Sequence, residues 1–434
     1  MNITIGIRQY AQNLLNFIDA SPSPWHTVST MEQELQIKGF LSLEESQDWS
    51  LVSGGKYYVV RGGSSLIVFI LGDVPLPDAG FRIVGAHTDS PGLRLKPKAA
   101  HGTEHMVRLG VEVYGGPILA TFTDRDLSLA GRVCLRTNDS IEIRLVCFDQ
   151  PLVRLPNLAI HLNRLVNEDG LKLNKQTELP LLIAGIDPNQ SATEHFDSLL
   201  ADRLQCNPSD ILSWDINVYD TQKGALWGPQ QEFIADSQLD NLSSCYAGLV
   251  ALLETEPAKN TCVGAFFDHE EIGSESSKGA VGSFIPDVLE RIASASDLSL
   301  SGYKQTLARS FLVSADAAHA YHPNFPNAYD PLHTVKVNAG PVIKINVNQR
   351  YATDGISEAQ FMQICKQVDV PFQKYVHRTD LTCGSTIGPM TAAKLGISTI
   401  DVGCPIWAMH SIRESGGVFD QIYFAKALKE FFRR

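Results

Sequence analysis

The sequence predicts an α/β protein in which a β-rich segment is inserted into a three-layer domain with a mixed central sheet. The chain of 434 residues suits two or three domains, or one large domain with an insertion. Strand-like and helical segments alternate near both ends of the chain, and a stretch that is largely strand-like lies between them. With 44% apolar and 19% charged residues, a chain of this size can bury a core without disulfides or structural metals.

The first segment, residues 1–95, combines a helix with several strands. Tyr10, Leu14, Leu15 and Ile18 stand at helical spacing, which predicts an amphipathic N-terminal helix. Apolar runs then predict strands in KYYVVRG, SSLIVFIL and FRIVGAH. A mixture of helix and buried strands is typical of a layered α/β domain.

The middle segment, residues 96–236, has a different pattern. Apolar and polar residues alternate in its runs, as expected for strands with one buried face. Gly115-Gly116 and Asn138-Asp139 are turn signals, and ATEHFDSLLADRLQ predicts one helix. The strand-like runs are MVRLGVEVYG, LSLAGRVCLR, SIEIRLVCF and VRLPNLAIHL. We expect an inserted β-rich domain that contacts another subunit or shapes the entrance to a site.

The last segment, residues 237–434, returns to alternating strands and helices. LDNLSSCYAGLVALLE carries a helical apolar stripe, and SEAQFMQICKQV and FDQIYFAKALKEFF predict two further helices. Between them, strands are predicted in CVGAFFD, ARSFLVSAD, GPVIKINV and ISTIDVG. This alternation favours a largely parallel or mixed sheet, so residues 1–95 and 237–434 together predict one discontinuous domain.

Charge and hydropathy argue against three classes of protein. The formal net charge is −12, and no run of lysines and arginines is long enough to follow a phosphate backbone. The longest apolar runs, such as residues 64–72, are far shorter than a membrane span. The N-terminus lacks the basic and apolar regions of a secretory signal. We therefore expect a cytoplasmic protein that binds neither nucleic acid nor a membrane.

The eight cysteines agree with a reducing compartment. None forms a Cys-x-x-Cys pair, and several lie within apolar strand-like runs. Reduced, buried thiols are therefore expected, rather than a zinc–thiolate site or a disulfide framework. The cysteines are Cys134, Cys147, Cys206, Cys245, Cys262, Cys365, Cys383 and Cys404.

His87 and Asp89, in the stretch GAHTDSP, are the first candidate functional residues. They follow a predicted strand, and residues two apart on a strand face the same side. In open α/β sheets, ligands bind where strands end. The stretch is either a turn that contains a histidine or one corner of a metal site, and taken alone it favours the turn.

Glu270 and Glu271 form the most informative pair. Adjacent carboxylates on an irregular segment point in different directions, so one can bind a metal while the other faces the water bound to that metal. This division suits hydrolysis, because the metal lowers the pKa of the water and the free carboxylate accepts its proton. A solvated acidic turn is the alternative, which the position behind a buried strand weakens.

Five further candidates stand at strand ends or at a helix start. Asp240 opens a predicted helix, where it either bridges two cations or caps the helix. Asp316 follows a strand and is a candidate ligand, whereas His319 and His322 are ligands or packing residues. His410, in AMHSIRE, is a ligand or a core histidine. Nitrogen and oxygen donors without thiolate suit zinc, with manganese or cobalt as substitutes.

These candidates lie in long strings whose order matches a known family. The chain resembles the aspartyl aminopeptidase family of metallopeptidases, family M18, over essentially its whole length. The strings that carry the resemblance are GAHTDSPGLRLKP, QLDNLSSCYAGL, FDHEEIGSESSKGA, SADAAHAYHPNF, NQRYATD, CGSTIGP and AMHSIRE.

The resemblance implies a zinc-peptidase-like catalytic domain over residues 1–95 and 237–434, with a dimerisation domain over 96–236. It also implies two zinc ions per subunit and the release of an N-terminal residue, with Asp or Glu preferred, from peptides whose N-terminus is free. The implied ligands are His87 and Asp316 for one zinc, Glu271 and His410 for the other, and Asp240 as the bridge between them.

The resemblance also assigns roles to residues that do not bind zinc. Glu270 would act as the general base that activates a metal-bridging water and then returns the proton to the leaving amine. Asp89 would orient His87, which favours the metal-site interpretation of GAHTDSP. Lys344 would bind the acidic side chain of the substrate; a lysine in an apolar run is more easily explained if its ammonium meets an anion.

The family also implies an assembly. His161, in PNLAIHLNR, matches a family histidine that reaches the active site of a neighbouring subunit, although a packing role is equally compatible with its apolar surroundings. Members of the family form dodecamers, so a homo-oligomer built from dimers is expected.

Two other functions are alternatives. A dizinc deacylase or carboxypeptidase of related fold would share the ligand types, but only an aminopeptidase loses activity when the substrate amine is blocked. A non-catalytic assembly protein would be expected to lack a metal ligand or Glu270, and the sequence retains all of them.

Overall fold

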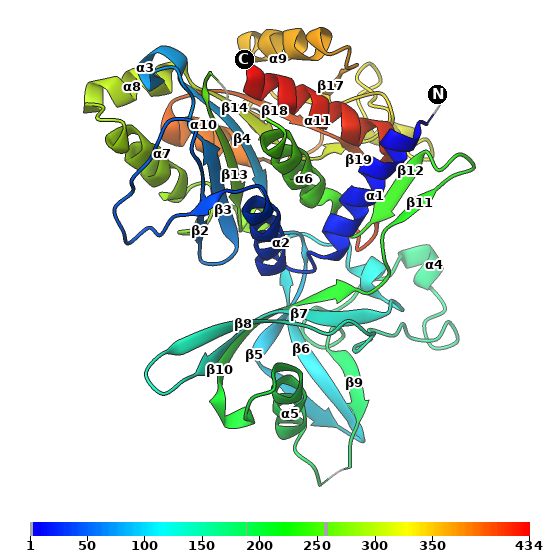
Figure 1. Ribbon diagram of the computed structural model, residues 1–434. Helices are drawn as coiled ribbons and strands as arrows, with labels where there is room; N and C mark the ends of the chain where they lie inside the picture. Colours follow the sequence, from blue (N-terminus) through cyan, green and yellow to red (C-terminus); the bar gives the residue numbers. More distant parts are fainter. Residues whose placement is uncertain (1–2, 188, 256–258) are drawn as a thin grey trace.

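The computed structural model describes residues 3–187, 189–255 and 259–434, which form two bodies of unequal size (Figure 1). The larger body, uppermost in Figure 1, contains both helix α1 (Ile5–Asp19) and helix α11 (Val418–Arg433), which contact each other. The smaller body is formed mainly by strands from the middle of the chain.

A nine-stranded mixed sheet is the centre of the larger body. Its strands are β1 (Leu41–Ser42), β2 (Lys56–Arg61), β3 (Ser65–Ile70), β4 (Phe81–His87), β13 (Thr261–Phe267), β14 (Phe311–Ala315), β16 (Val342–Ile345), β17 (Gln373–Val376) and β18 (Ser398–Gly403). They lie in the order β1-β2-β3-β13-β4-β14-β18-β16-β17, and the run β13-β4-β14-β18 is parallel. Parallel strands bring their carboxyl ends to one edge, so the polar residues that follow these strands meet there.

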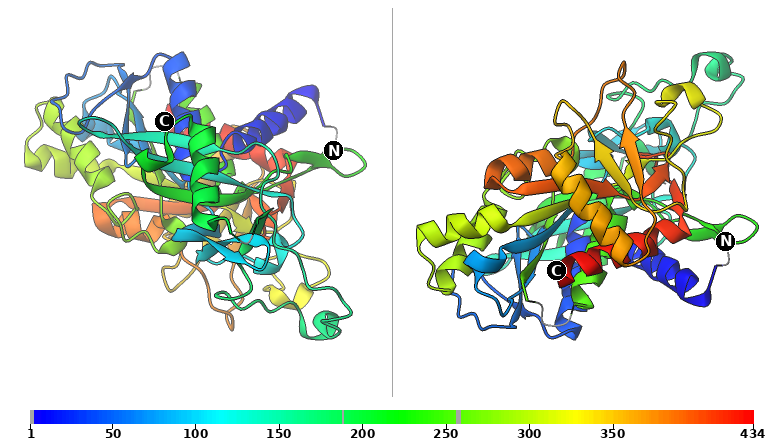
Figure 2. Two further views of the ribbon diagram at one scale, coloured as in Figure 1. Left: turned by 90° about the horizontal axis from the view of Figure 1, so that it is seen from below. Right: turned by 90° about the horizontal axis from the view of Figure 1, so that it is seen from above.

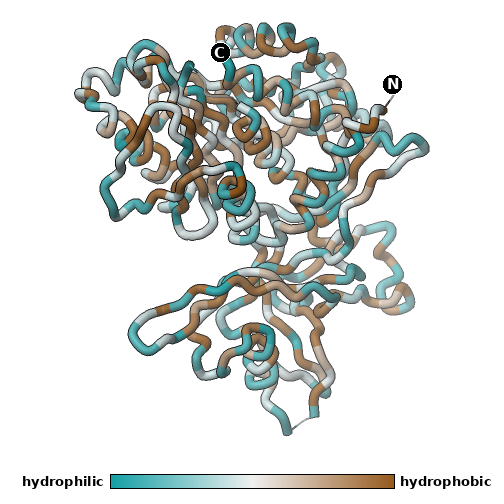
Figure 3. The backbone as a smooth tube through the Cα atoms, in the orientation of Figure 1, coloured by the Kyte–Doolittle hydropathy of each residue, from teal (hydrophilic) through white to brown (hydrophobic). Residues whose placement is uncertain are grey.

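Helices cover both faces of this sheet, as the two views in Figure 2 show. One face packs against α1, α2 (Pro24–Ile37), α6 (Leu239–Leu253), α9 (Gly355–Gln367) and α11. The other packs against α3 (Leu76–Ala79), α7 (Phe284–Ala295), α8 (Leu300–Arg309) and α10 (Ile387–Leu395). Alternate residues of β4 enter the two apolar clusters, Val84 on one side and Ile83 on the other. The predicted three-layer α/β class is therefore confirmed, and hydrophobic segments run through the interior of the larger body (Figure 3).

A six-stranded antiparallel sheet forms the smaller body. Its strands are β5 (Gly92–Thr103), β6 (Met106–Tyr114), β7 (Leu127–Arg136), β8 (Ile141–Cys147), β9 (Leu181–Gly185) and β10 (Ile211–Asp220), in the order β8-β7-β10-β5-β6-β9. Helix α5 (Ala192–Leu204) packs on this sheet through Phe196 and Leu200, which gives the smaller body its own apolar core.

A third, five-stranded sheet joins distant parts of the chain. Its strands, in spatial order, are β11 (Ala225–Trp227), β12 (Phe233–Asp236), β20 (Glu414–Gly417), β19 (Pro405–Trp407) and β15 (Ala318–His319). The first two fall inside the predicted insertion, residues 96–236, yet they belong to the sheet of the C-terminal strands. Because strand pairing defines a compact unit, we propose that the inserted domain is residues 92–220. The short helices are α4 (Val166–Asp169), η1 (Leu119–Phe122), η2 (Pro208–Asp210), η3 (Glu270–Ile272) and η4 (Pro326–Ala328).

One predicted strand is wrong. In VRLPNLAIHL only Val153 and Arg154 form isolated bridges, and residues 156–162 lie exposed outside any sheet. Pro156 lacks the N–H that a ladder needs, so the alternating pattern does not continue as a strand.

The prediction of buried, reduced thiols is confirmed for burial at only four of the eight cysteines. All eight are free thiols, and Cys245, Cys262, Cys365 and Cys404 are buried. In addition, none of the helices in the described parts of the chain is long and apolar enough to cross a membrane.

Candidate metal centre

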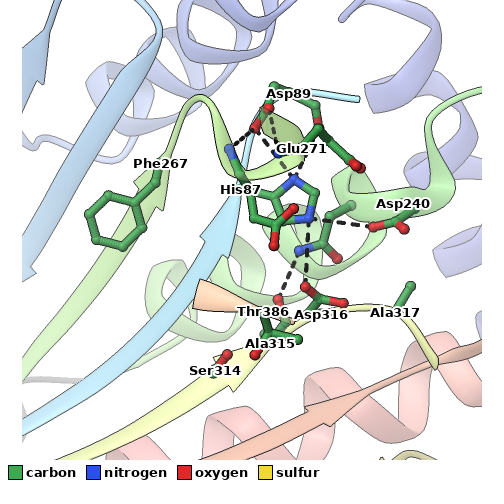
Figure 4. Close-up of polar contacts among 12 residues, drawn as sticks. His87, Asp89, Asp240, Phe267, Glu271, Ser314, Ala315, Asp316, Ala317 and Thr386 are labelled. Carbon is green, nitrogen blue, oxygen red and sulfur yellow. Dashed lines mark hydrogen bonds and ion pairs between the residues drawn. The ribbon is translucent and has the colours of Figure 1, made fainter. Parts of the chain in front are cut away.

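His87 lies at the centre of a polar cluster at the carboxyl edge of the nine-stranded sheet (Figure 4). It ends β4 and is 1% exposed. Its Nε2 atom lies 3.5 Å from Oδ1 of Asp240 and 3.8 Å from Oδ2 of Asp316. Asp316 follows β14 directly, and Asp240 lies in the first turn of α6. The parallel strands thus bring together residues that are far apart in the sequence.

The backbone of Asp89 fixes the orientation of the His87 ring. The Nδ1 atom of His87 is 3.0 Å from the Asp89 carbonyl oxygen, to which it donates, and 3.5 Å from Oδ1 of the same residue. A donating Nδ1 leaves the lone pair of Nε2 directed toward Asp240 and Asp316, which is the tautomer needed to bind a metal. The prediction that Asp89 orients His87 has this geometry as its support.

The Asp89 carboxylate also holds the Glu270-Glu271 pair. Its Oδ1 accepts the backbone N–H of Glu270, and its Oδ2 accepts that of Glu271, both at 3.1 Å. Burial alone would raise the pKa of Asp89, but hydrogen bonds from His87, Tyr114 and Glu271 lower it. Asp89 therefore remains an ionised acceptor beneath the two glutamates.

The two glutamates are buried beside other carboxylates. Burial raises the pKa of Glu270 to about 8, and Asp316, Asp89 and Asp240 add to this rise, while His87 opposes it. Burial followed by repulsion from Asp240 holds the pKa of Glu271 well above its usual range. Burial is the main cause of both shifts, and the neighbouring carboxylates add negative charge that a nearby cation would offset.

His410 completes a second group of donors. Its Nε2 atom lies 3.4 Å from Oε2 of Glu271 and 3.6 Å from Oδ2 of Asp240. These three residues offer ligand atoms that all lie within 4.8 Å of one another, and so do His87, Glu270 and Glu271. Histidine and carboxylate donors at this spacing are a set that suits zinc.

Asp240 connects the two groups. Its Oδ1 faces His87 and its Oδ2 faces His410. The Oδ1 atom is buried and accepts no hydrogen bond within the described residues. A buried carboxylate oxygen without a partner is costly, and a cation would satisfy it. The residues therefore fit a metal centre, with Asp240 in the position of a bridge.

Asp316 and Lys344 form an ion pair at the edge of this cluster. Lys344 is 2% exposed, and its ammonium donates to Oδ1 of Asp316 at 2.8 Å and to the Ala317 carbonyl at 3.1 Å. Lys344, in the apolar strand β16, is thus paired with an anionic side chain of this chain, that of Asp316. Oδ2 of Asp316 remains directed toward His87, but Asp316 is not among the residues that lie within 4.8 Å of one another in either group.

His161, His319 and His322 form no hydrogen bond or ion pair with the cluster among the described residues. His161 is on an exposed turn. His319 packs 5.8 Å from the Tyr375 ring, and burial lowers its pKa to about 4. His322 stacks 4.8 Å from Phe325. For His319 and His322 these contacts favour the packing alternative.

Glu414 is a residue of the site that the sequence patterns did not single out. Its carboxylate is buried and accepts the backbone N–H of Asp240 at 2.8 Å and of His410 at 2.6 Å. It therefore fixes the main chain of two candidate ligands. The available signal was its place four residues after His410, at the start of β20.

Similarity to known proteins agrees with this geometry. The family model described as aminopeptidase I zinc metalloprotease (M18) matches residues 17–432. A probable M18 family aminopeptidase 2 from Ectopseudomonas mendocina (strain ymp) is 47% identical over 425 residues, which cover 97% of each chain.

Two solved structures are also similar. In the cryo-EM structure of the Ape4 and Nbr1 complex, one chain is 37% identical with a TM-score of 0.96, and the match covers 100% of this chain and 88% of that chain. In the mApe1 dodecamer of S. cerevisiae, the identity is 28% and the TM-score 0.85, with 98% and 96% of the two chains covered.

Zinc should raise the melting temperature of chelator-treated protein, because the ion binds the folded carboxylate cluster and not the unfolded chain. At a free zinc concentration 100 times its Kd, the gain is about 2.7 kcal/mol. Asp240→Asn keeps the side-chain shape but removes the shared charge, so it should lose most of the zinc-induced rise in calorimetry. Asp420→Asn is the control, since Asp420 is also buried but accepts the backbone N–H groups of Asn338 and Gly340. An equal zinc-induced rise in both variants would contradict the assignment.

Proposed function

The chain belongs to the M18 family of zinc aminopeptidases, and from that premise we propose that it removes acidic N-terminal residues from peptides at a two-zinc site. Zinc-dependent aminopeptidase activity is the property of the family; the number of ions, the base and the acidic preference are our proposal. The observation that carries it is the Asp240 carboxylate, whose two oxygens face His87 on one side and His410 on the other.

The proposed ligands follow from this arrangement. His87 and Asp316 would hold one ion, Glu271 and His410 would hold the other, and Asp240 would serve both. Two ions held there would polarise the scissile carbonyl as Lewis acids and lower the pKa of the attacking water. Support for the pairing comes from the Nε2 atoms of both histidines, which point to opposite oxygens of one carboxylate.

Glu270 is the proposed general base. Asp89 accepts a hydrogen bond from the backbone N–H of Glu270. The carboxyl group of Glu270 lies beside His87 and Glu271. From this position it accepts a proton from the attacking water and delivers that proton to the leaving amine. Burial and the neighbouring carboxylates raise its pKa, and cations bound beside it would offset that rise and leave the carboxylate able to accept a proton.

Lys344 is the proposed selector of acidic side chains. An ammonium has three donors, and Asp316 and Ala317 occupy two of them. The third N–H remains for a carboxylate of the substrate. Neighbouring carboxylates of the centre would bind the free α-amino group, which limits cleavage to the first residue of a peptide.

A narrow cavity of about 40 Å³ lies beside the metal centre, between the two bodies. It is lined by Asp240 and His410 together with Arg94 and Asn217 of the six-stranded sheet. Because the inserted sheet forms one wall, the size of this pocket depends on how the two bodies pack.

We also propose a homo-oligomer. His161 lies on an exposed segment with several large apolar neighbours, among them Leu162, which is 74% exposed. Exposed apolar patches of this kind mark contact surfaces. One similar structure is a dodecamer. If a neighbouring subunit covers this segment, His161 of one subunit would reach the pocket of the other.

The substitution Glu270→Gln should abolish most turnover while leaving zinc bound, because it removes the base but keeps the shape of the side chain. General-base removal typically costs roughly 10²- to 10⁴-fold in rate. Steady-state kinetics with an Asp-led peptide and zinc content by mass spectrometry give the two readouts. Glu275→Gln, an exposed glutamate nearby in the sequence, is the control. Turnover within a few-fold of wild type would exclude Glu270 as the base.

A panel of Asp-, Glu-, Leu- and Ala-led peptides tests the substrate class. We expect fastest release from the Asp- and Glu-led peptides, no release after a chelator, and no release from peptides with an acetylated N-terminus. Release measured from the blocked peptides would instead indicate a deacylase or carboxypeptidase. Fastest release from Leu- or Ala-led peptides would leave the metal chemistry intact but remove the role proposed for Lys344.

A further inference from the structure

The turn after β6 is the place where the six-stranded sheet reaches the metal centre. Tyr114 is the last residue of β6, and Gly115-Gly116 follows it. Each of these three residues contacts a different residue of the centre, although they belong to the other body.

Tyr114 donates a hydrogen bond to Asp89. Its hydroxyl lies 2.7 Å from Oδ2, the oxygen that also accepts the backbone N–H of Glu271. The other oxygen of Asp89 accepts the N–H of Glu270 and lies 3.5 Å from Nδ1 of His87. The hydroxyl thus fixes the rotation of the carboxylate that holds the main chain of both glutamates and lies beside His87. A hydrogen bond to a buried, ionised carboxylate is among the stronger ones in a protein.

The ring of Tyr114 is itself held in place. The guanidinium of Arg94, on the neighbouring strand β5, lies 3.9 Å from the centre of the ring. The same guanidinium lies 5.6 Å from the ring of Trp25, which belongs to α2 of the larger body. A stack of two rings and one cation across the junction restricts the ring of Tyr114 to one position.

The two glycines contact the other side of the centre. Gly115 has φ +66°, and a Cβ added there would come within 3.2 Å of Cβ and the carbonyl oxygen of Glu271. The carbonyl of Gly116 accepts a hydrogen bond from Nδ1 of His410 at 3.1 Å. His410 therefore directs Nε2 toward Asp240 and Glu271, just as Asp89 directs Nε2 of His87.

We propose that the segment Tyr114–Gly116 of the inserted sheet positions both halves of the metal centre, with the Tyr114 hydroxyl acting through Asp89 on His87, Glu270 and Glu271. Tyr114 is a positioning residue, because it contacts neither the candidate ligands directly nor the proposed substrate pocket. Zinc affinity then depends on the inserted sheet, and the proposal rests on the metal site described above.

Tyr114→Phe tests the proposal, because it removes the hydroxyl and keeps the ring under Arg94. Partners that orient metal ligands typically contribute roughly 10- to 100-fold in metal affinity or activity, so zinc affinity measured by chelator competition should fall in this range. The value of kcat should fall with it, while KM stays within about twofold. Tyr58→Phe is the matched control, since Tyr58 is also buried and its hydroxyl accepts a hydrogen bond from Gln36 instead of donating to the centre.

A double-substitution cycle separates positioning from general stability. If Tyr114 acts through Asp89, the double variant Tyr114→Phe/Asp89→Asn should bind zinc no more weakly than Asp89→Asn alone. Additive losses of zinc affinity in the double variant would overturn the proposal. Wild-type zinc affinity in Tyr114→Phe would also overturn it, whatever the melting temperature of the zinc-free variant. Arg94→Lys, which keeps the charge but loses the planar stack, should give a smaller loss in the same direction. Failure of the wild-type protein to bind zinc would instead contradict the metal site itself.

Discussion

Buried negative charge is the constraint on which this structure depends. Six carboxyl groups meet at one edge of the nine-stranded sheet, and an isolated buried carboxylate is too costly to be kept without compensation. Some of this charge is compensated, because backbone N–H groups bind Asp89 and Glu414 and the Lys344 ammonium pairs with Asp316. Burial and the neighbouring carboxylates raise the pKa values of Glu270 and Glu271. The negative charge that remains without compensation is centred on Asp240, whose Oδ1 has no hydrogen-bond partner in the described residues. The six groups are those of Asp89, Asp240, Glu270, Glu271, Asp316 and Glu414.

All three sheets contribute to this compensation. The nine-stranded sheet supplies His87 and Asp316 at its strand ends, because its central strands are parallel. The five-stranded sheet supplies Glu414, which holds the main chain of Asp240 and His410. The six-stranded sheet supplies the turn after β6, which contacts Asp89, Glu271 and His410. The centre is therefore a product of how the sheets pack together, which explains why an inserted β-rich segment belongs in a metal-dependent enzyme.

Local sequence patterns predicted the elements and most of the centre, but not the contacts made across sheets. Periodicity found β4, β13, β14 and α6, because alternating or helical apolar patterns report burial directly. Polar residues behind those strands then predicted His87, Asp240, Glu270 and Glu271 as neighbours. Glu414 and Tyr114 were missed, since nothing local distinguishes a glutamate or tyrosine that will meet a distant carboxylate or amide. For the same reason the sequence indicated that Lys344 meets an anion but gave no sign that Asp316 is that anion.

A crystal structure of the zinc-loaded protein, with anomalous data collected at the zinc edge, tests the central claim most directly. The account predicts two anomalous peaks per subunit, roughly 3.5–4 Å apart, one beside His87 and one beside His410, with Asp240 between them. A single peak, or two peaks that do not share Asp240 as a ligand, would contradict it.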